Sequence, residues 1–352
     1  MHKLKAAVIG LGRMGAEPSS RLEGKIPNGW LPISHVEAIL STSGLELVAL
    51  CDQDEQKLEH FKTYYKIENG FTDYRKLIDE IRPEFLSIAT RTSIRKDIII
   101  NAVENGVRLI YAEKPLCNSA AECEDILALL KKHQIIVGYG VNRRYHYLYR
   151  KARQLIYDGL IGDLKEIHVE HGYGNLLWSH PHSIDMLLFF AGTCEFQYVQ
   201  GKCNFSSSYN AQDLLIDDDP FIEHAYIKFC NGVQGVITSS GGTNVRLCGT
   251  KGNIAIHGDG KFLECYIGTD YFYDRLVINE EPSSSATETV FSEMINAYYS
   301  NSKVPISPEE ILAGHIISTG IVQSSLNNSS LLKFVDINKN ITVTGKLGDF
   351  YA

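Results

Sequence analysis

The chain has 352 residues, of which 44% are hydrophobic and 22% charged, as is typical of a globular protein with a sizeable core. Its length fits two ordinary domains or one large one. The net charge of −8 and the scattered basic residues exclude an electrostatic partnership with nucleic acid. No apolar stretch approaches the roughly 20 residues that a membrane-spanning helix needs, so a membrane is not an expected partner either.

The eight cysteines show neither a CxxC pair nor the spacing of zinc ligands. Several lie in expected strands, which predicts buried, reduced thiols and no metal site. Met1 is followed at once by an expected strand rather than by the basic and apolar regions of a secretory leader. These features together predict a cytoplasmic protein.

Short apolar runs alternate with helix-like stretches in the first part of the chain. This order predicts a parallel sheet with helices on both faces. The expected strands cover residues 5–9, 45–51, 85–89, 107–111 and 135–139, and the expected helices cover 56–65, 74–81, 94–104 and 120–133.

The pattern changes after a helix expected over residues 147–157, because strands then dominate. Turn pairs such as Asn231-Gly232 separate these strands, which predicts a mostly antiparallel sheet. We therefore expect a doubly wound α/β domain over residues 1–142 and an α+β domain, with a large open sheet flanked by helices, over residues 143–352. The strands expected in the second domain cover 165–171, 196–203, 224–229, 235–239, 244–248, 253–257 and 262–267, and its last helices cover 287–300 and 308–325.

Gly10, Gly12 and Gly15 form a GxGxxG motif directly after the first expected strand. In this place glycines permit a tight turn, close approach of the backbone to a pyrophosphate, and close packing of a helix whose N-terminus favours phosphate. The second expected strand ends at Asp52, whose carboxylate can accept the ribose hydroxyls of NAD and would repel the 2′-phosphate of NADP. The motif therefore predicts a Rossmann domain that binds NAD, although Asp52 can also cap the segment that follows it.

Asp52 lies farther from the glycines than in most such domains. The acidic residue normally follows by about 20 positions, and here the gap is nearly twice as long. We attribute the excess to an insertion over residues 16–32, through which a helix cannot run unbroken because it contains Pro18, Pro27 and Pro32. The insertion is either a loop over the cofactor pocket or a surface excursion.

Glu113-Lys114-Pro115, after the fourth expected strand, is a more specific motif than the glycines. With this motif in place, the chain resembles the Gfo/Idh/MocA oxidoreductases, named for glucose–fructose oxidoreductase and inositol dehydrogenase. The resemblance covers almost the whole chain. The segments that carry it are GLGRMG at 10–15, the strand end at Asp52, FTDYRKLI at 71–78, AEKP at 112–115, GYGVNRRY at 138–145, GLIGDLKEI at 159–167, HSIDMLLFFAG at 182–192 and LCGTKGNI at 247–254.

The resemblance implies roles for two residues in hydride transfer. Lys114 would reach the nicotinamide and the reacting substrate oxygen, where its charge stabilises an alkoxide-like oxygen; it also follows a parallel strand, at the sheet edge where ligands bind. His182, in an HxxD arrangement, would be the general acid or base, a task that suits the near-neutral pKa of histidine. The cofactor site that we expect comprises Gly10, Gly12, Arg13, Met14, Gly15, Asp52, Thr90, Glu113 and Lys114.

Positions 178 and 180, which precede His182, depart from the family's pattern. Many members carry an aspartate four positions before this histidine and a glycine two positions before it, where this chain has Trp178 and His180. His180 is the nearest substitute for the missing carboxylate, and Trp178 either stacks on a sugar face or serves as a core or lid aromatic. No third ligand accompanies His180 and His182, so we expect no metal there.

Other residues are expected to line the substrate cleft. Arg91 and Arg95 replace residues that the family often has near the nicotinamide, and they either hold an anionic substrate or face solvent. Asp185, one helical turn after His182, would contact that histidine or the substrate. The segment Asp217–Asp219 reads as a short polar loop without a role. The expected substrate-binding residues are Asn142, Arg144, Trp178, His180, Asp185 and Arg95.

These observations predict an NAD(H)-dependent oxidoreductase that acts on a secondary alcohol or ketone of a sugar, a cyclitol or a nucleotide sugar. Two alternatives stay open: an NAD-binding sensor or regulatory protein without turnover, and an enzyme that uses tightly bound NAD for internal redox epimerisation or elimination. The resemblance further implies a homodimer or homotetramer, in which one face of the second domain's sheet is covered by a partner subunit.

Overall fold

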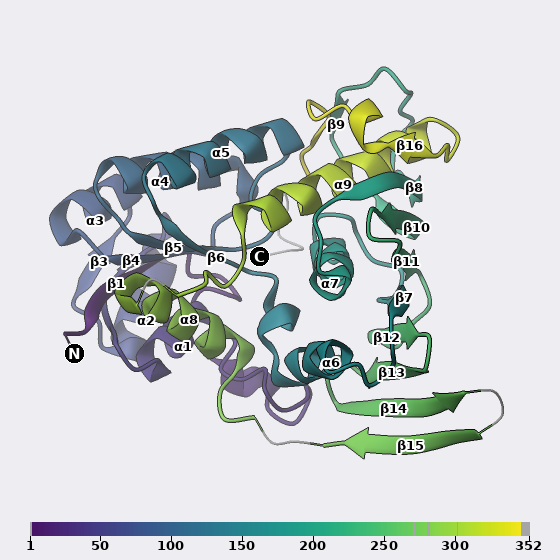
Figure 1. The fold of residues 1–352 in the computed structure, drawn as a ribbon. Coiled ribbons are helices and arrows are strands. Elements are labelled where there is room, and N and C mark those ends of the chain that lie inside the picture. The colour runs from purple at the N-terminus through teal and green to yellow at the C-terminus, as the bar shows by residue number, and fades with distance from the viewer. Residues whose placement is uncertain (1, 270–271, 280–281, 301, 346–352) are drawn as a thin grey trace.

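The computed structural model describes residues 2–269, 272–279, 282–300 and 302–345, and it contains two main sheets. Figure 1 shows a smaller sheet with helices on both of its faces beside a larger sheet that is seen nearly edge-on. The predicted fold class, a Rossmann sheet followed by a mostly antiparallel open sheet with helices, is confirmed.

The first sheet has six parallel strands in the order β3-β2-β1-β4-β5-β6, which is a doubly wound arrangement. Its central strands β4 and β5 are buried throughout, as expected where helices cover both faces. The strands are β1 Leu4–Ile9, β2 Leu45–Cys51, β3 Asn69–Phe71, β4 Phe85–Ile88, β5 Leu109–Ala112 and β6 Ile136–Tyr139, and the helices are α1 His35–Ser41, α2 Glu55–Tyr65, α3 Tyr74–Ile81, α4 Thr92–Glu104 and α5 Ala120–Lys132.

The second sheet has nine strands in the order β15-β14-β13-β12-β7-β11-β10-β8-β16, and its pairs are antiparallel except β7 with β11. Helices α6 Tyr147–Tyr157, α7 His180–Ala191 and α9 Pro308–Leu326 lie on the side that faces the first domain (Figure 1). The strands are β7 Leu164–Glu170, β8 Phe196–Asn204, β10 Phe221–Phe229, β11 Gln234–Thr238, β12 Asn244–Gly249, β13 Gly252–His257, β14 Phe262–Thr269, β15 Phe272–Ile278 and β16 Leu332–Lys333.

The remaining elements connect the two sheets. Helix α8 Ala286–Ser300 returns from the second domain to pack against β5 and β6 of the first. The predicted boundary after residue 142 falls in the 3-10 helix η2 Asn142–Tyr145 and stays a prediction. The minor elements are the 3-10 helices η1 Ser19–Leu22 and η3 Phe334–Asp336 and the parallel pair of β9 Leu215–Ile216 with β17 Thr342–Val343.

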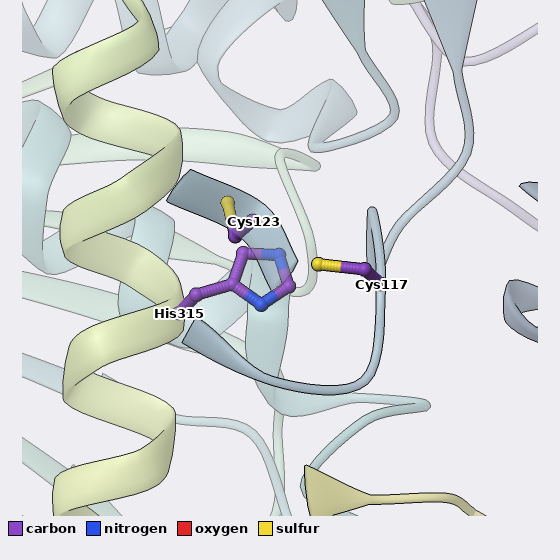
Figure 2. Close-up of side chains that lie close together, drawn as sticks. All are labelled: Cys117, Cys123 and His315. Atoms are coloured by element: carbon purple, nitrogen blue, oxygen red, sulfur yellow. The ribbon is translucent and has the colours of Figure 1, made fainter. Parts of the chain in front are cut away.

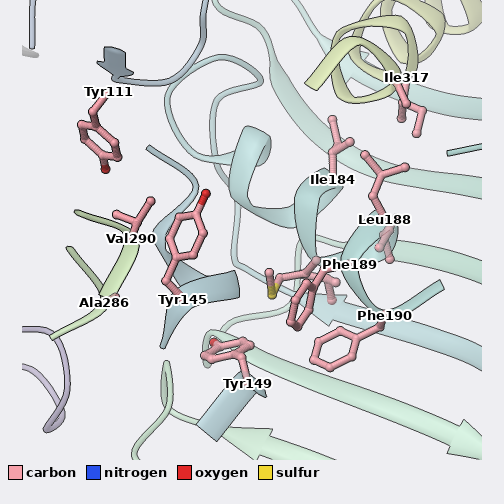
Figure 3. Close-up of a cluster of buried hydrophobic side chains, with 14 of the residues drawn as sticks. Tyr111, Tyr145, Tyr149, Ile184, Leu188, Phe189, Phe190, Ala286, Val290 and Ile317 are labelled. Carbon is pink, nitrogen blue, oxygen red and sulfur yellow. The ribbon is translucent and has the colours of Figure 1, made fainter. Parts of the chain in front are cut away.

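The largest hydrophobic core runs through both domains without a break. Figure 3 shows Tyr145 and Tyr149 between Tyr111, which comes from β5, and the phenylalanines of α7. The three tyrosines are at most 1% exposed. Because aromatic rings of this size each bury a large apolar area, this layer fixes how the two sheets face one another.

The insertion interrupts a helix after its first turn, and the helix then resumes. Ala16 N–H donates to Gly12 O, as in a regular helix, but His35 N–H donates to Met14 O at 2.8 Å and Val36 N–H to Gly15 O at 2.9 Å. His35 thus takes the place of residue 18, so 17 residues are inserted, over 18–34 rather than 16–32. Asp52 is 37 positions after Gly15, and removal of these 17 residues restores the usual spacing of 20.

The insertion bridges the two domains and is therefore not a free surface excursion. Trp30 is 6% exposed, donates from Nε1 to Asp259 O at 2.8 Å and stacks on His146 with ring centroids 4.8 Å apart. His146 Nε2 in turn pairs with Asn28 O at 2.9 Å, and Ala286 N–H, at the start of α8, donates to Gly29 O. The inserted segment thus joins the glycine turn to α6, α8 and the turn after β13.

We predict that Trp30→Ala lowers the free energy of unfolding by about 3–5 kcal/mol, because it leaves a cavity and an unpaired carbonyl between the domains. The shift is measured from urea unfolding curves followed by circular dichroism. Tyr157→Ala is the matched control, because Tyr157 is 87% exposed and its loss should change stability by less than about 0.5 kcal/mol. Equal stability of the two variants would show that the insertion does not hold the domains together.

Candidate active site

The glycine turn has the geometry that a dinucleotide needs. Gly10 has a φ of +91°, and a Cβ there would lie 2.8 Å from the carbonyl carbon of Ala89, at the end of β4. A Cβ at Gly15 would lie 1.9 Å from Gly10 O, so only glycine permits this close packing. A Cβ at Gly12 would meet no atom within 4 Å, so the backbone there borders open space. The three glycines match the turn, phosphate approach and helix packing of a nucleotide-binding strand–turn–helix unit.

Asp52 lies next to this turn and binds its backbone. Its Oδ2 accepts the Leu11 N–H at 2.8 Å, and its Oδ1 accepts the Asp54 N–H at 3.0 Å. Asp52 does not cap α2 as the sequence suggested, because the N-cap of that helix is Asp54, whose N–H Asp52 binds. Each carboxylate oxygen has a second lone pair, which leaves acceptors for the hydroxyls of a ribose. The side chain is half-buried at the carboxyl end of β2, where ligands bind in doubly wound sheets.

The other expected cofactor residues surround the turn. Arg13 is exposed and Met14 is half-buried, and their carbonyls accept hydrogen bonds from Arg21 and His35. Thr90 is half-buried just after β4. These placements border the glycine turn, and the contact of each residue with the cofactor stays a prediction.

Glu113 is held by a buried chain of hydrogen bonds. Its Oε1 lies 3.1 Å from His35 Nε2, and His35 Nδ1 lies 2.8 Å from Ser87 Oγ. Although burial alone would raise the pKa of Glu113, its hydrogen bond and charge interaction with His35 hold that pKa below its ordinary value. Oε2 of Glu113 accepts the Lys114 N–H at 3.2 Å. The buried carboxylate therefore fixes the backbone from which Lys114 projects.

Arg95 braces the same segment and lies where neither interpretation of the sequence placed it. It is 2% exposed, so it does not face solvent. Its guanidinium donates to Glu113 O at 2.6 Å and also to the carbonyls of Thr90 and Pro115. Because its donors serve three backbone carbonyls, Arg95 holds the ends of β4 and β5 together rather than an anionic substrate.

Lys114 projects from the end of β5 toward Trp178. Its Nζ donates to Trp178 O at 2.6 Å and lies 4.6 Å from the centroid of the indole ring. Burial lowers the pKa of Lys114 to about 8, although the charge of Glu113 opposes this shift. Trp178, where the resemblance leads us to expect an aspartate, thus gives the ammonium a neutral cation–π partner, which stabilises it less than a carboxylate would.

His182, in the first turn of α7, borders a shallow hollow. Its Nδ1 is buried and has no hydrogen-bond partner among the described residues. Burial, with the charges of Arg143 and Lys114, lowers the pKa of His182 well below its ordinary value, so the imidazole is neutral near pH 7. The hollow is lined by Arg143, Tyr149, Val169, His171, His182, Ser183, Met186, Thr243, Asn244 and Val245.

Two further histidines lie beside His182. His171 directly follows β7, and its ring lies 5.9 Å from that of His180. Burial lowers the pKa of His171 to about 3 and that of His180 to about 4. His180 is fully buried and pairs through Nδ1 with Ser183 Oγ at 3.1 Å. The sequence prediction missed His171, because it took this residue for the last one of the strand expected over residues 165–171, whereas β7 ends at Glu170.

Asp219 is a second residue that the prediction missed, because its segment was taken for a polar loop without a role. It is 3% exposed, and its carboxylate accepts the N–H groups of Leu177 at 2.7 Å and Trp178 at 3.2 Å. Burial raises its pKa to about 6, while Lys114 acts in the opposite direction. Asp219 thus supplies the buried carboxylate of this region and positions Trp178 against Lys114.

Three expected substrate residues bind other protein groups. Arg144 and Asp185 form a buried ion pair with Nη2 and Oδ1 2.6 Å apart, and Arg144 Nη1 also reaches Glu310 Oε1 at 3.0 Å. Asn142 is 4% exposed and accepts the hydroxyl hydrogen of Tyr111 at 2.8 Å. None of the three lines the hollow beside His182. They connect η2 to α7, α9 and β5.

A family model described as "Oxidoreductase family, NAD-binding Rossmann fold" matches residues 4–141. The resemblance to the Gfo/Idh/MocA oxidoreductases is thus confirmed. The chain is 28% identical over 170 residues to inositol 2-dehydrogenase of Salmonella typhimurium, which covers 48% of this chain and 46% of the relative. It is 26% identical over 284 residues to scyllo-inositol 2-dehydrogenase (NAD(+)) of Bacillus subtilis, over 72% of this chain and 74% of the relative. The match to inositol 2-dehydrogenase thus spans about half the length of that relative.

Solved structures share the fold over nearly the whole chain. Levoglucosan dehydrogenase in complex with NADH and levoglucosan has a TM-score of 0.73 at 18% identity and covers 95% of this chain and 100% of its own. A putative NADPH-dependent oxidoreductase from Desulfitobacterium hafniense has a TM-score of 0.77 at 18% identity, over 96% of this chain and 99% of that chain.

The predicted cofactor, NAD, agrees with the NAD-binding fold that the family model describes. Within the described residues, no helix has the length and apolarity to cross a membrane.

We predict that Asp52→Asn reduces the preference for NADH over NADPH by about tenfold, because it removes the charge that repels a 2′-phosphate. Asparagine keeps an oxygen that can accept the Leu11 N–H, so the turn is retained. Dissociation constants for both cofactors from fluorescence titration give the ratio. Asp54→Asn, which alters the neighbouring cap of α2, should leave the ratio unchanged. An unaltered ratio in Asp52→Asn would mean that the ribose is held elsewhere.

Proposed function

We propose that this protein is an NAD(H)-dependent oxidoreductase that transfers a hydride to or from a secondary alcohol or ketone of a sugar, a cyclitol or a nucleotide sugar. The observation that carries the proposal is the contact of Lys114 with the segment that leads into α7. Its Nζ donates to Trp178 O at 2.6 Å, four positions before His182, and its charge helps to lower the pKa of that histidine. Relatives named as inositol 2-dehydrogenases support a cyclitol or a similar polyol as substrate.

The proposed chemistry divides between two side chains. NAD, when bound, supplies or accepts the hydride. Lys114 in its ammonium form donates a hydrogen bond to the substrate oxygen and stabilises negative charge there. His182 is neutral, and its Nδ1 is free to accept the proton of a substrate hydroxyl during oxidation and to return it during reduction. The burial of both groups strengthens these interactions because it excludes water.

Trp178 tunes Lys114 in this proposal. A carboxylate in its place would stabilise the ammonium and raise the pKa of the lysine. The indole ring holds the ammonium through its π face instead, and burial keeps the pKa of the lysine at about 8. A more acidic ammonium is a stronger hydrogen-bond donor, which suits a group that stabilises negative charge on the substrate oxygen while His182 returns the proton.

The two alternatives from the sequence make different predictions. A sensor without turnover is favoured by Trp178 and His180, which replace the family's residues with groups that bind other protein atoms. An enzyme with internal redox recycling differs from a dehydrogenase because its cofactor stays bound during turnover.

We also propose a cytoplasmic location, consistent with eight free cysteines, and a homodimer or homotetramer.

The proposal is tested by titration of NADH, followed by a dehydrogenase screen of sugars, inositols, sugar acids and nucleotide sugars. Tight NADH binding with turnover of one substrate class is the expected result. Tight binding with substrate conversion but no release of NADH would indicate internal recycling. Binding without conversion of any substrate would favour the sensor, and failure to bind either cofactor would overturn the proposal.

We predict that Lys114→Ala lowers kcat by at least about 10²–10³-fold, because the substrate oxygen loses its charged donor. Its NADH dissociation constant should change by no more than a few-fold. Steady-state kinetics and NADH titration measure the two effects separately. Lys132→Ala on the exposed surface of α5 is the control and should behave as wild type. A kcat near that of wild type in Lys114→Ala would remove this lysine from the mechanism.

The pKa of Lys114, about 8, predicts how ketone reduction depends on pH. The rate requires the ammonium form, so kcat/KM should be constant near pH 7 and fall as the pH rises through about 8. His182 should add no inflection near pH 6.5, because its pKa lies well below that value. Trp178→Asp should move the fall to higher pH, whereas Trp178→Phe should leave it near 8. A profile that stays flat to pH 10 would contradict the role of Lys114.

A further inference from the structure

Two thiols and an imidazole meet inside the molecule at a distance from the hollow beside His182. The ligand atoms of Cys117, Cys123 and His315 all lie within 4.8 Å of one another, and the three side chains are buried. Figure 2 shows the ring of His315 projecting from α9 between the two sulfur atoms. Cys117 lies in the loop after β5, and Cys123 lies in the first turn of α5. The cluster therefore joins the first domain to α9.

We propose that Cys117, Cys123 and His315 bind one zinc ion. Two thiolates and an imidazole form a donor set that zinc prefers, with Zn–S distances near 2.3 Å and Zn–N distances near 2.0 Å. Tetrahedral coordination at these lengths places the ligand atoms about 3.5–3.8 Å apart. The observed separations, up to 4.8 Å, need to shorten by only about 1 Å.

An unpartnered nitrogen distinguishes this cluster from ordinary packing of buried thiols. His315 Nε2 is buried and has no hydrogen-bond partner among the described residues. A buried polar atom without a partner costs about 1–3 kcal/mol, so native proteins rarely retain one without a use.

The charge balance of the site is compatible with a divalent cation. Cys117 Sγ donates its S–H to Ser119 O at 3.3 Å, and both thiols lose their protons when they bind zinc as thiolates. Binding of Zn²⁺ displaces these two protons and forms two Zn–S bonds, with no redox change. The resulting group has no net charge, so the nearby positive charge of Arg95, which acts on His315, does not exclude it.

Zinc with three protein ligands needs a fourth, which a water molecule can supply. His315 also borders a small hollow, together with Tyr139, Pro115 and Gly314. The bound ion would fasten the loop that follows Lys114 to α5 and α9. Zinc is therefore expected to stabilise the fold independently of cofactor or substrate, so this proposal does not rest on the proposed activity.

The test is zinc binding by the full chain after metal is removed with a chelator. We expect one zinc per chain by elemental mass spectrometry, a rise in Tm on zinc addition, and a thiolate-to-metal absorption band when Co²⁺ is used instead. Cys117→Ser and His315→Ala should each weaken zinc binding by at least about 100-fold, because each removes a metal bond. Cys230→Ser, at an exposed cysteine, should bind as wild type does.

A second measurement uses the wild-type chain and avoids variants that fail to fold. Zinc should protect Cys117 and Cys123 from alkylation during partial unfolding, while Cys230 reacts at the same rate with and without the ion. Peptide mass spectrometry identifies the modified cysteines. Absence of stoichiometric zinc, a Co²⁺ spectrum without the thiolate band, or protection of other cysteines in place of these two would overturn the proposal.

Discussion

The buried carboxylate of Glu113 is the constraint on which the arrangement of the site depends. A charge at 7% exposure is tolerated only when donors surround it, and these come from His35 on α1 and from the N–H of Lys114. His35 reaches this place only because α1 resumes in register after the insertion, and Arg95 secures the carbonyls on either side. The register of α1, the ends of β4 and β5 and the direction of Lys114 therefore depend on the ionised carboxylate of Glu113.

The neutral character of the site follows from what surrounds Lys114. The indole of Trp178 lies against its ammonium, and the imidazoles of His171, His180 and His182 are kept uncharged by burial. A cation in such surroundings loses hydration without gaining a full counter-charge, which lowers its pKa. The carboxylate of Asp219 is close enough to oppose this shift, but both of its oxygens are occupied by backbone N–H groups. Burial thus lowers the pKa of Lys114 by more than the neighbouring carboxylates raise it.

The domains are held in place by contacts of different chemistry, spread along their whole interface. An aromatic layer fills the centre (Figure 3), the insertion bridges one end through Trp30, and the ion pair of Arg144 with Asp185 lies between η2 and α7. The cluster of Cys117, Cys123 and His315 connects α5 with α9 (Figure 2). Because hydride transfer requires reacting groups to be positioned within fractions of an ångström, a rigid interface is what the proposed chemistry needs from the two domains.

The sequence by itself determined the alternation of strands and helices, the glycine turn, the strand end at Asp52 and the resemblance to an oxidoreductase family, because each depends on residues close together along the chain. It also predicted the start of α9, where Ser307 and Glu310 form a reciprocal cap. Only the tertiary structure decided which side chains meet. Asp219 reaches Trp178, Arg144 pairs with Asp185 and His315 joins two distant cysteines because the sheet topology brings these segments together. Local periodicity carries no information on such pairs, so Arg95 and Asp185 could be placed near the site but not assigned their partners.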